Sequence, residues 1–146
     1  MSNLPPMTKD QIARAIPHAG AMNLLHAVTG GDRDWIACTA VSHRDPANPL
    51  RHDGRLPSSA GAEYAAQAIA LHAQLTGIEK EPRRGFLAVV NNLTWTRDRL
   101  DQVAGDLEVR AEQLAATGAA LQYAITLVGD GQVLVMGELM VALERA

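Results

Sequence analysis

The sequence predicts an α+β domain in which one long apolar helix is wrapped by an antiparallel β-sheet. Residues 58–76, which read SSAGAEYAAQAIALHAQLT, are rich in alanine and nearly free of charge. A helix that is apolar on most of its sides must be buried. Segments elsewhere in the chain alternate apolar and polar residues as half-buried strands do, most clearly at 105–115. These strands are therefore expected to cover the helix.

The expected elements succeed one another without an internal repeat or a domain boundary. Thr8 and Gln11 have the spacing of a capping box, which predicts a short helix that reaches Ala15 and stops before Pro17. Gly77 is expected to end the long helix, which follows the second strand. Strands are expected at 22–28, 35–41, 85–95, 105–115, 119–128 and 133–143, with turns at 29–32 and 129–132. This order is that of the hotdog fold, with residues 1–146 as a single domain.

Composition excludes several classes of function. A chain of 146 residues that is 47% hydrophobic is long enough to bury a core. The net charge of −3 and the lack of a Lys/Arg block argue against nucleic-acid binding, although an acidic carrier protein can still dock on a local arginine patch. The single cysteine, Cys38, excludes an intramolecular disulfide and a Cys-rich zinc site. With no signal peptide and no membrane span expected, the default interpretation is a cytoplasmic protein without a cofactor.

The strongest local signal for chemistry is Glu63, in the first turns of the apolar helix. Gln67 follows one turn later on the same face. Burial against apolar walls favours the neutral, proton-donating form of a carboxyl group, so Glu63 can act as a general acid that Gln67 holds in position. The alternative is that Glu63 only complements the positive end of the helix dipole. Because its neighbours are apolar, the catalytic interpretation is preferred.

The candidate bases are His43 and His52, which lie in the long Pro/Gly-containing loop before the helix. Histidine is suited to proton abstraction near neutral pH. Either residue can instead be an ordinary surface histidine. Asp45 and Asp53 can orient an imidazole ring, or they can be turn residues. Because loops of this length in a compact domain are usually functional, the two histidines are retained as candidates.

The other three histidines, His18, His26 and His72, are interpreted as structural or surface groups. No pair of His and acidic residues shows the spacing of metal ligands, so no metal site is expected.

Glycine and proline near the helix start suggest a place where a ligand approaches the backbone. Gly54 and Pro57 lie in the lead-in, and Gly61 opens the helix. Main-chain N–H groups at such a position can polarise a thioester carbonyl. Turn chemistry alone explains these residues equally well.

Two segments resemble the β-hydroxyacyl-ACP dehydratases. Gly54-Arg55-Leu56-Pro57, followed by Gly61-Ala62-Glu63-Tyr64-Ala65-Ala66-Gln67-Ala68, resembles the loop and helix start of that family. Ile16-Pro17-His18 with Met22-Asn23-Leu24-Leu25 resembles its beginning. The nearest resemblance is to the ApeP-like branch, which is linked to aryl polyene and related lipid synthesis. The motifs cover residues 16–28 and 43–72.

The resemblance implies that a base removes the C2 proton of a 3-hydroxyacyl thioester while an acid helps the C3 hydroxyl leave as water. Carried over, Glu63 is the acid and Gln67 supports it. The family's His-Phe-Pro-Gly element is absent, and its usual position falls near Asn48-Pro49. A loop insertion can bring His43 into place, His52 can substitute, or neither serves. His43 is preferred because it ends an expected strand.

The resemblance also implies an acyl carrier protein as partner and a homodimer or higher even oligomer, with the site shared between subunits. The leading hypothesis is a 3-hydroxyacyl-[acyl-carrier-protein] dehydratase of fatty-acid or aryl-polyene-type synthesis. One alternative is a hotdog acyl thioesterase, which can work with the carboxylate alone. The other is a non-catalytic hotdog partner subunit of a dehydratase.

Overall fold

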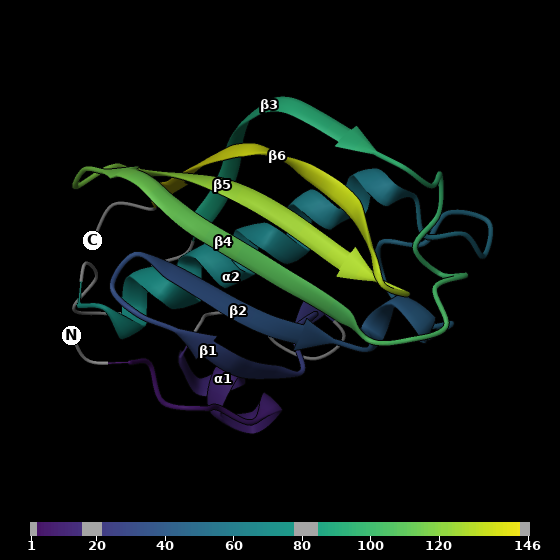
Figure 1. The fold of residues 1–146 in the computed structure, drawn as a ribbon, viewed down its shortest axis with the longest axis horizontal. Coiled ribbons are helices and arrows are strands. Elements are labelled where there is room, and N and C mark those ends of the chain that lie inside the picture. The colour runs from purple at the N-terminus through teal and green to yellow at the C-terminus, as the bar shows by residue number, and fades with distance from the viewer. Residues whose placement is uncertain (1–2, 16–21, 78–84, 144–146) are drawn as a thin grey trace.

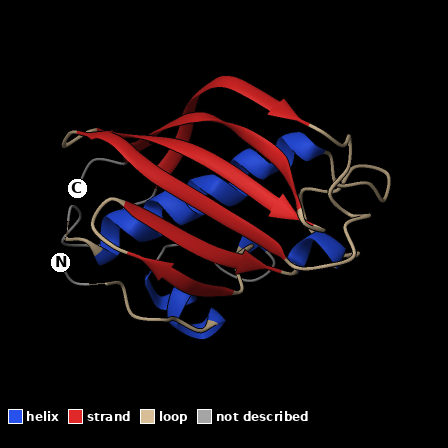
Figure 2. Cartoon of the chain, viewed as in Figure 1, coloured by secondary structure: helices blue, strands red, loops and turns tan. Residues whose placement is uncertain are grey.

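The computed structural model describes residues 3–15, 22–77 and 85–143 and has the expected order of elements. Helix α2 runs along one face of a single six-stranded antiparallel sheet, and the short helix α1 lies beside β1 (Figures 1 and 2). The elements are α1 Lys9–Ala15, β1 Ala27–Gly31, β2 Trp35–Ala40, α2 Gly61–Leu75, β3 Gly85–Trp95, β4 Leu107–Ala116, β5 Ala120–Gly129 and β6 Gln132–Leu143, with 3-10 turns η2 Ser42–Arg44 and η3 Ser58–Ala60. This is the hotdog arrangement that the sequence predicted.

The sheet order is β1-β2-β4-β5-β6-β3, so β1, the first strand, and β3, the strand that follows α2, lie at opposite edges. Burial alternates residue by residue along β5 and along the first half of β4, because one face of the sheet packs on α2. Aliphatic side chains from both layers form one core. Its large fully buried side chains include Leu71 from the helix and Leu107, Leu121 and Leu127 from the strands.

Local signals predicted the ends of several elements correctly. Thr8 and Gln11 form the expected capping box, with the Thr8 N–H donating to Oε1 of Gln11 at 2.9 Å. Gly77 follows the helix with a φ of 78°, the left-handed conformation that ends helices. The β5–β6 hairpin turns through Asp130 and Gly131, whose φ values of 50° and 74° match a two-residue turn of the primed type.

The first strand was predicted wrongly at 22–28. Strand β1 begins at Ala27, and the expected turn at Thr29–Gly31 is part of it. The turn falls later, where the Asp34 N–H donates to Oδ1 of Asp32 at 2.8 Å. The apolar residues Leu24 and Leu25 are buried without belonging to a strand. These two apolar residues were therefore mistaken for part of a strand because they are buried in the core.

The long helix and the fourth strand also differ in detail from the prediction. Residues 58–60 form the 3-10 turn η3 rather than the first turn of α2. Strand β4 begins at Leu107, two residues later than expected. The backbone of Gly105 is bound instead by Asp130 and His43, which takes it out of the strand.

The two edges of the sheet differ in their exposure. Beside β1, the Leu4 N–H donates to Gly31 O at 3.0 Å, and Met7 exchanges two backbone hydrogen bonds with Val28. At the other edge, β3 pairs only with β6 among the described residues. The β1 edge is thus covered by the chain itself, whereas the β3 edge is open.

Candidate active site

The start of α2 is held by the loop between β3 and β4. Leu100 N–H donates to Leu56 O at 2.8 Å, and Ser58 N–H donates to Asp98 O at 2.9 Å. The Ser58 hydroxyl donates to the carbonyl of Arg97, and Pro57 forms a bridge with Arg99. Together these hydrogen bonds pair residues 56–58 with residues 97–100 as in a short antiparallel sheet. They fix the direction in which α2 leaves the long loop.

Asp101 strengthens this connection. Its Oδ1 accepts the Leu56 N–H at 2.9 Å, and its Oδ2 lies 2.5 Å from Nη2 of Arg99. The Arg99 guanidinium, together with the Leu56 amide, lowers the pKa of Asp101 to about 2. Asp101 is therefore ionised at neutral pH and ties residue 56 to the β3–β4 loop.

Glu63 is the only carboxylate of α2 and lies in its first turn. Gly61, two residues earlier, faces the sheet, so at 100° per residue Glu63 leaves the helix on roughly the opposite side. Its side chain is half-buried and has no hydrogen bond or ion pair with the described residues. Its position in the first turn also complements the helix dipole.

Gln67 does not hold Glu63, contrary to expectation. Its Oε1 accepts the Leu24 N–H at 2.9 Å, and its Nε2 donates to Met22 O at 2.5 Å. The side chain is buried, and its carboxamide binds the backbone of the segment before β1 on both sides. Gln67 therefore anchors residues 22–24 to the helix.

Tyr64 is a component of the site region that sequence reasoning missed. Ser42 Oγ donates to Leu24 O at 2.8 Å, so the hydroxyl of Tyr64, 2.7 Å away, donates to Ser42 Oγ. Nδ2 of Asn48 in turn donates to Tyr64 at 3.0 Å, and Oδ1 of Asn48 accepts the Leu50 N–H at 2.9 Å. The chain of donors joins the long loop to α2 beside Glu63. The only sequence signal was a polar aromatic residue within an apolar helix.

His43 lies in η2 and is fully buried. Its Nε2 lies 3.1 Å from Val103 O and 2.9 Å from Gly105 O. Carbonyl oxygens only accept, so Nε2 carries a proton and the neutral ring keeps its lone pair on Nδ1. Nδ1 is buried and has no partner among the described residues. Burial also lowers the pKa of His43, which favours this neutral form at pH 7.

His52 occupies a different position, on the surface. Residues 52–55 form a tight turn in which His52 and Arg55 exchange backbone hydrogen bonds of 2.8 and 2.9 Å. Gly54 lies at its tip with a φ of 75° and open space around it, so turn geometry accounts for this glycine. His52, Asp53, Arg55 and Pro57 line an open depression of about 480 Å³. His52 and Pro57 are thus close together, whereas His43 is turned toward the β3–β4 loop.

Gly61 has a packing role in the structure. A Cβ at this position would lie 3.2 Å from Cδ2 of Leu127 and 3.2 Å from Cγ2 of Val135, so glycine allows the helix to approach the sheet. Its N–H donates to the carbonyls of Ser58 and Ser59. Of the two interpretations weighed from the sequence, ligand approach and turn chemistry, this N–H fits turn chemistry.

His72 is a buried structural group, as expected. Nε2 lies 2.8 Å from Asp32 O and so donates to it, and Nδ1 lies 2.5 Å from the hydroxyl of Tyr123. His26 is exposed, and His18 lies outside the described residues. No cluster of His, Cys, Asp and Glu that could hold a metal ion occurs among the described residues. In the same part of the chain, no helix is both long and apolar enough to cross a membrane.

The described chain thus combines a half-buried carboxyl group at the start of the buried helix with a buried histidine in the loop before it. The sequence matches the ApeP-like family, described as ApeP dehydratase, over residues 10–145. The chain belongs to this dehydratase family. A comparison with curated proteins finds no sequence match.

Solved structures confirm the hotdog fold. One chain of the ApeI:P dehydratase heterocomplex from Xenorhabdus doucetiae matches this ApeP-like chain with a TM-score of 0.80 and 24% identity. The match covers 92% of this chain and 91% of that one. A thioesterase from Haemophilus influenzae matches with a TM-score of 0.65 and 15% identity, covering 95% and 92%. A mutant thioesterase from Pseudomonas aeruginosa matches with a TM-score of 0.63 and 17% identity, covering 92% and 91%.

Proposed function

We propose that this ApeP-like chain is a dehydratase that removes water from a 3-hydroxyacyl thioester carried by an acyl carrier protein. Glu63 is the acid: it delivers a proton to the C3 hydroxyl as the C3–O bond breaks. His43 is the base: it takes the C2 proton, and the electrons of that C–H bond form the C2–C3 double bond. The products are a 2-enoyl thioester and water.

The observation that carries the proposal is the carboxyl group of Glu63, which has no partner among the described residues, in a family of dehydratases. Structural carboxylates in buried elements are usually paired or hydrogen-bonded. Asp101 illustrates this, since it binds Arg99 and Leu56. A half-buried carboxyl group without such partners is available to a substrate.

The proposed base supports the same chemistry. The neutral ring of His43 offers one unused lone pair, on Nδ1, while Nε2 is held by two carbonyls. No part of the ring is exposed in the single chain. The proposal therefore requires the loop 42–57 to move, or to be reshaped by a second subunit, before the substrate reaches Nδ1.

We also propose that the β3 edge forms the subunit contact. Val89 and Val90 are 40% and 42% exposed on this strand, and only β6 pairs with it among the described residues. Exposed apolar side chains on an open strand edge favour pairing with another chain. A second copy would continue the sheet and bring new residues toward α2.

For docking of the carrier protein, Arg55 is available at the rim of the depression beside Pro57.

The decisive experiment is turnover of a 3-hydroxyacyl thioester, on carrier protein and on coenzyme A, followed by mass spectrometry. Loss of 18 mass units, the mass of one water, identifies dehydration. Release of free acid identifies a thioesterase instead. The Glu63→Gln variant should lose dehydration, whereas the matched variant Glu112→Gln, altered on the exposed face of β4, should keep it. Unchanged dehydration by Glu63→Gln would exclude the proposed acid.

A second candidate is a non-catalytic partner subunit of a dehydratase. The complete burial of His43 favours it, because a base must reach its substrate. The structural relative from Xenorhabdus doucetiae, which belongs to a heterocomplex, is consistent with it. In that case the purified chain would be inactive, and a second hotdog subunit would restore turnover even with Glu63→Gln present.

A further inference from the structure

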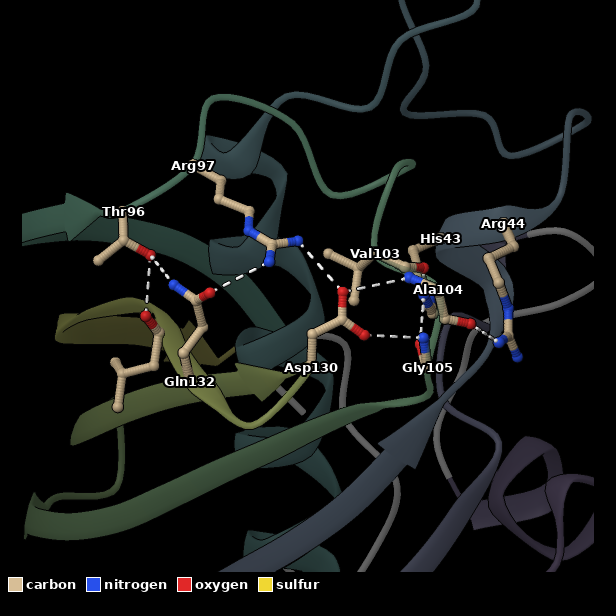
Figure 3. Close-up of polar contacts among 10 residues, drawn as sticks. His43, Arg44, Thr96, Arg97, Val103, Ala104, Gly105, Asp130 and Gln132 are labelled. Atoms are coloured by element: carbon tan, nitrogen blue, oxygen red, sulfur yellow. Dashed lines mark hydrogen bonds and ion pairs between the residues drawn. The ribbon is translucent and has the colours of Figure 1, made fainter.

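Asp130 binds, from the opposite side, the backbone segment 103–105 that holds His43. Asp130, in the β5–β6 turn, accepts the Gly105 N–H at Oδ1 with a distance of 3.1 Å and the Ala104 N–H at Oδ2 with 3.4 Å. The carbonyl oxygens of Val103 and Gly105 accept from His43. Figure 3 shows the two side chains on either side of this backbone segment.

The peptide between Val103 and Ala104 links the two side chains directly. Its N–H donates to the Asp130 carboxylate, and its C=O accepts from Nε2 of His43. A negative charge at the N–H end of a peptide increases the negative charge on its carbonyl oxygen, because hydrogen bonds in a chain polarise one another. The carboxylate therefore strengthens the acceptor that binds the Nε2 proton.

We propose that Asp130 is a positioning residue for His43, which acts through the Val103–Ala104 peptide to strengthen the hydrogen bond from Nε2 and so hold the ring with its lone pair on Nδ1. Asp130 has no contact with the ring itself. Any effect of Asp130 on dehydration rests on the proposed function. The effect of Asp130 on the His43 ring does not depend on that function.

Other charges around His43 do not provide the same interaction. Arg44 pairs with Asp106 at 2.8 Å and donates to Ala104 O at 2.5 Å, so it binds the next peptide along. Arg51 donates to the backbone carbonyl of His43 at 3.0 Å. Asp130 is the carboxylate that accepts the N–H of the Val103–Ala104 peptide, whose carbonyl binds Nε2.

The backbone conformation of Asp130 and an ion pair with Arg97 fix the position of the carboxylate. Asp130 has a φ of 50° and is followed by Gly131 with a φ of 74°. Arg97 holds Oδ2 from the other side, with its Nη1 at 3.2 Å. Asn is also tolerated in the left-handed conformation, so the Asp130→Asn variant should keep the turn while removing the charge.

The test is ¹⁵N NMR of the histidine rings in the full-length protein, with His43 assigned from the His43→Gln spectrum. In the unaltered protein, His43 should show the Nε2–H tautomer at pH 7.5. In Asp130→Asn the two carbonyls still accept from Nε2, so the Nε2–H tautomer should persist, and the titration midpoint of His43 should fall by about 0.5–1 pH unit, as expected for loss of a screened charge several ångströms away. Arg97→Gln removes the ion pair with Asp130 and a hydrogen bond to Gln132 but keeps the charge of Asp130, so it should not lower the midpoint.

Either of two results would overturn the proposal. One is a His43 ring that is not in the Nε2–H form in the unaltered protein, a measurement that needs no variant. The other is an Asp130→Asn ring that titrates with the same midpoint as before. If the NMR changes occur but Asp130→Asn dehydrates the thioester at the original rate, Asp130 positions His43 and the assignment of His43 as the base fails.

Discussion

The hydroxyl of Tyr123 on β5 lies 2.5 Å from Nδ1 of His72 on α2, and the two rings meet edge to face with centroids 5.5 Å apart. Because Nε2 of His72 donates to Asp32 O, Nδ1 must accept the Tyr123 proton. The pair thus joins helix, sheet and the β1–β2 turn. The variant Tyr123→Phe removes the donor and leaves Nδ1 unpaired. We expect a loss of about 1–3 kcal/mol in the free energy of unfolding, measured with urea; a loss below the error of that measurement would contradict this role.

Stability should fall as the solution becomes mildly acidic. Burial holds the pKa of His43 and His72 below the ordinary 6.5. In the unfolded chain both rings take up a proton as pH falls through 6.5, whereas in the folded chain they stay neutral to lower pH. Each ring can therefore cost up to about 1.4 kcal/mol per pH unit below 6.5. Urea unfolding at pH 7.5, 6.5 and 5.5 measures this slope.

The slope should become smaller in a His72→Gln variant, because one of the two buried rings is then absent. A free energy of unfolding that does not change between pH 7.5 and 5.5 would show that the rings are not held neutral.

Asp101 should matter more than a surface aspartate with a similar ion pair. In Asp101→Ala, the buried N–H of Leu56 loses its acceptor, which we expect to cost about 1–3 kcal/mol of unfolding free energy. The control is Asp106→Ala, which breaks the exposed pair with Arg44 and should cost about 0–1 kcal/mol. Equal effects of the two variants, measured by thermal and urea unfolding, would rule out the proposed connection.

The pKa of about 2 gives Asp101 a separate signature in acid. Its contribution to stability is present above about pH 4 and is lost as pH falls toward 2, because the unfolded carboxyl group protonates first. Asp101→Ala should therefore show a weaker dependence on pH in this range.

The hydroxyl of Tyr64 should control the mobility of the long loop. Tyr64→Phe breaks the donor chain between Asn48 and Ser42 while keeping the ring in the core. We expect faster hydrogen exchange at the Leu50 amide, which depends on an ordered Asn48. Amides of β5 should exchange as before. Unchanged exchange at Leu50 would mean that the backbone alone holds the loop.

The open β3 edge predicts the effect of a surface charge on assembly. Val90→Lys places a charge on this edge and should shift the protein toward the monomer in sedimentation velocity. Val133, which is 41% exposed on β6, offers a matched control, since Val133→Lys lies away from the edge. If the two variants sediment alike, the subunit contact lies elsewhere.

The sequence by itself determined the elements that depend on neighbouring residues. The apolar run that became Gly61–Leu75 predicted a buried helix, and Gly77 predicted its end. Asp130 and Gly131 predicted a hairpin because a tight turn needs residues that tolerate positive φ. Glu63 was identified as a candidate because a charged residue stands out when all of its sequence neighbours are apolar. Periodicity and turn chemistry are local, so one chain suffices to see them.

Only the tertiary structure decided what the polar side chains bind. Gln67 was expected to support Glu63 four residues away, but it binds backbone at Met22 and Leu24. His43 was preferred as the base, and it donates to carbonyls about 60 residues later in the chain. A buried polar group must take whichever partner the packed fold brings within hydrogen-bond distance, and hydrophobic patterning carries no information about that partner.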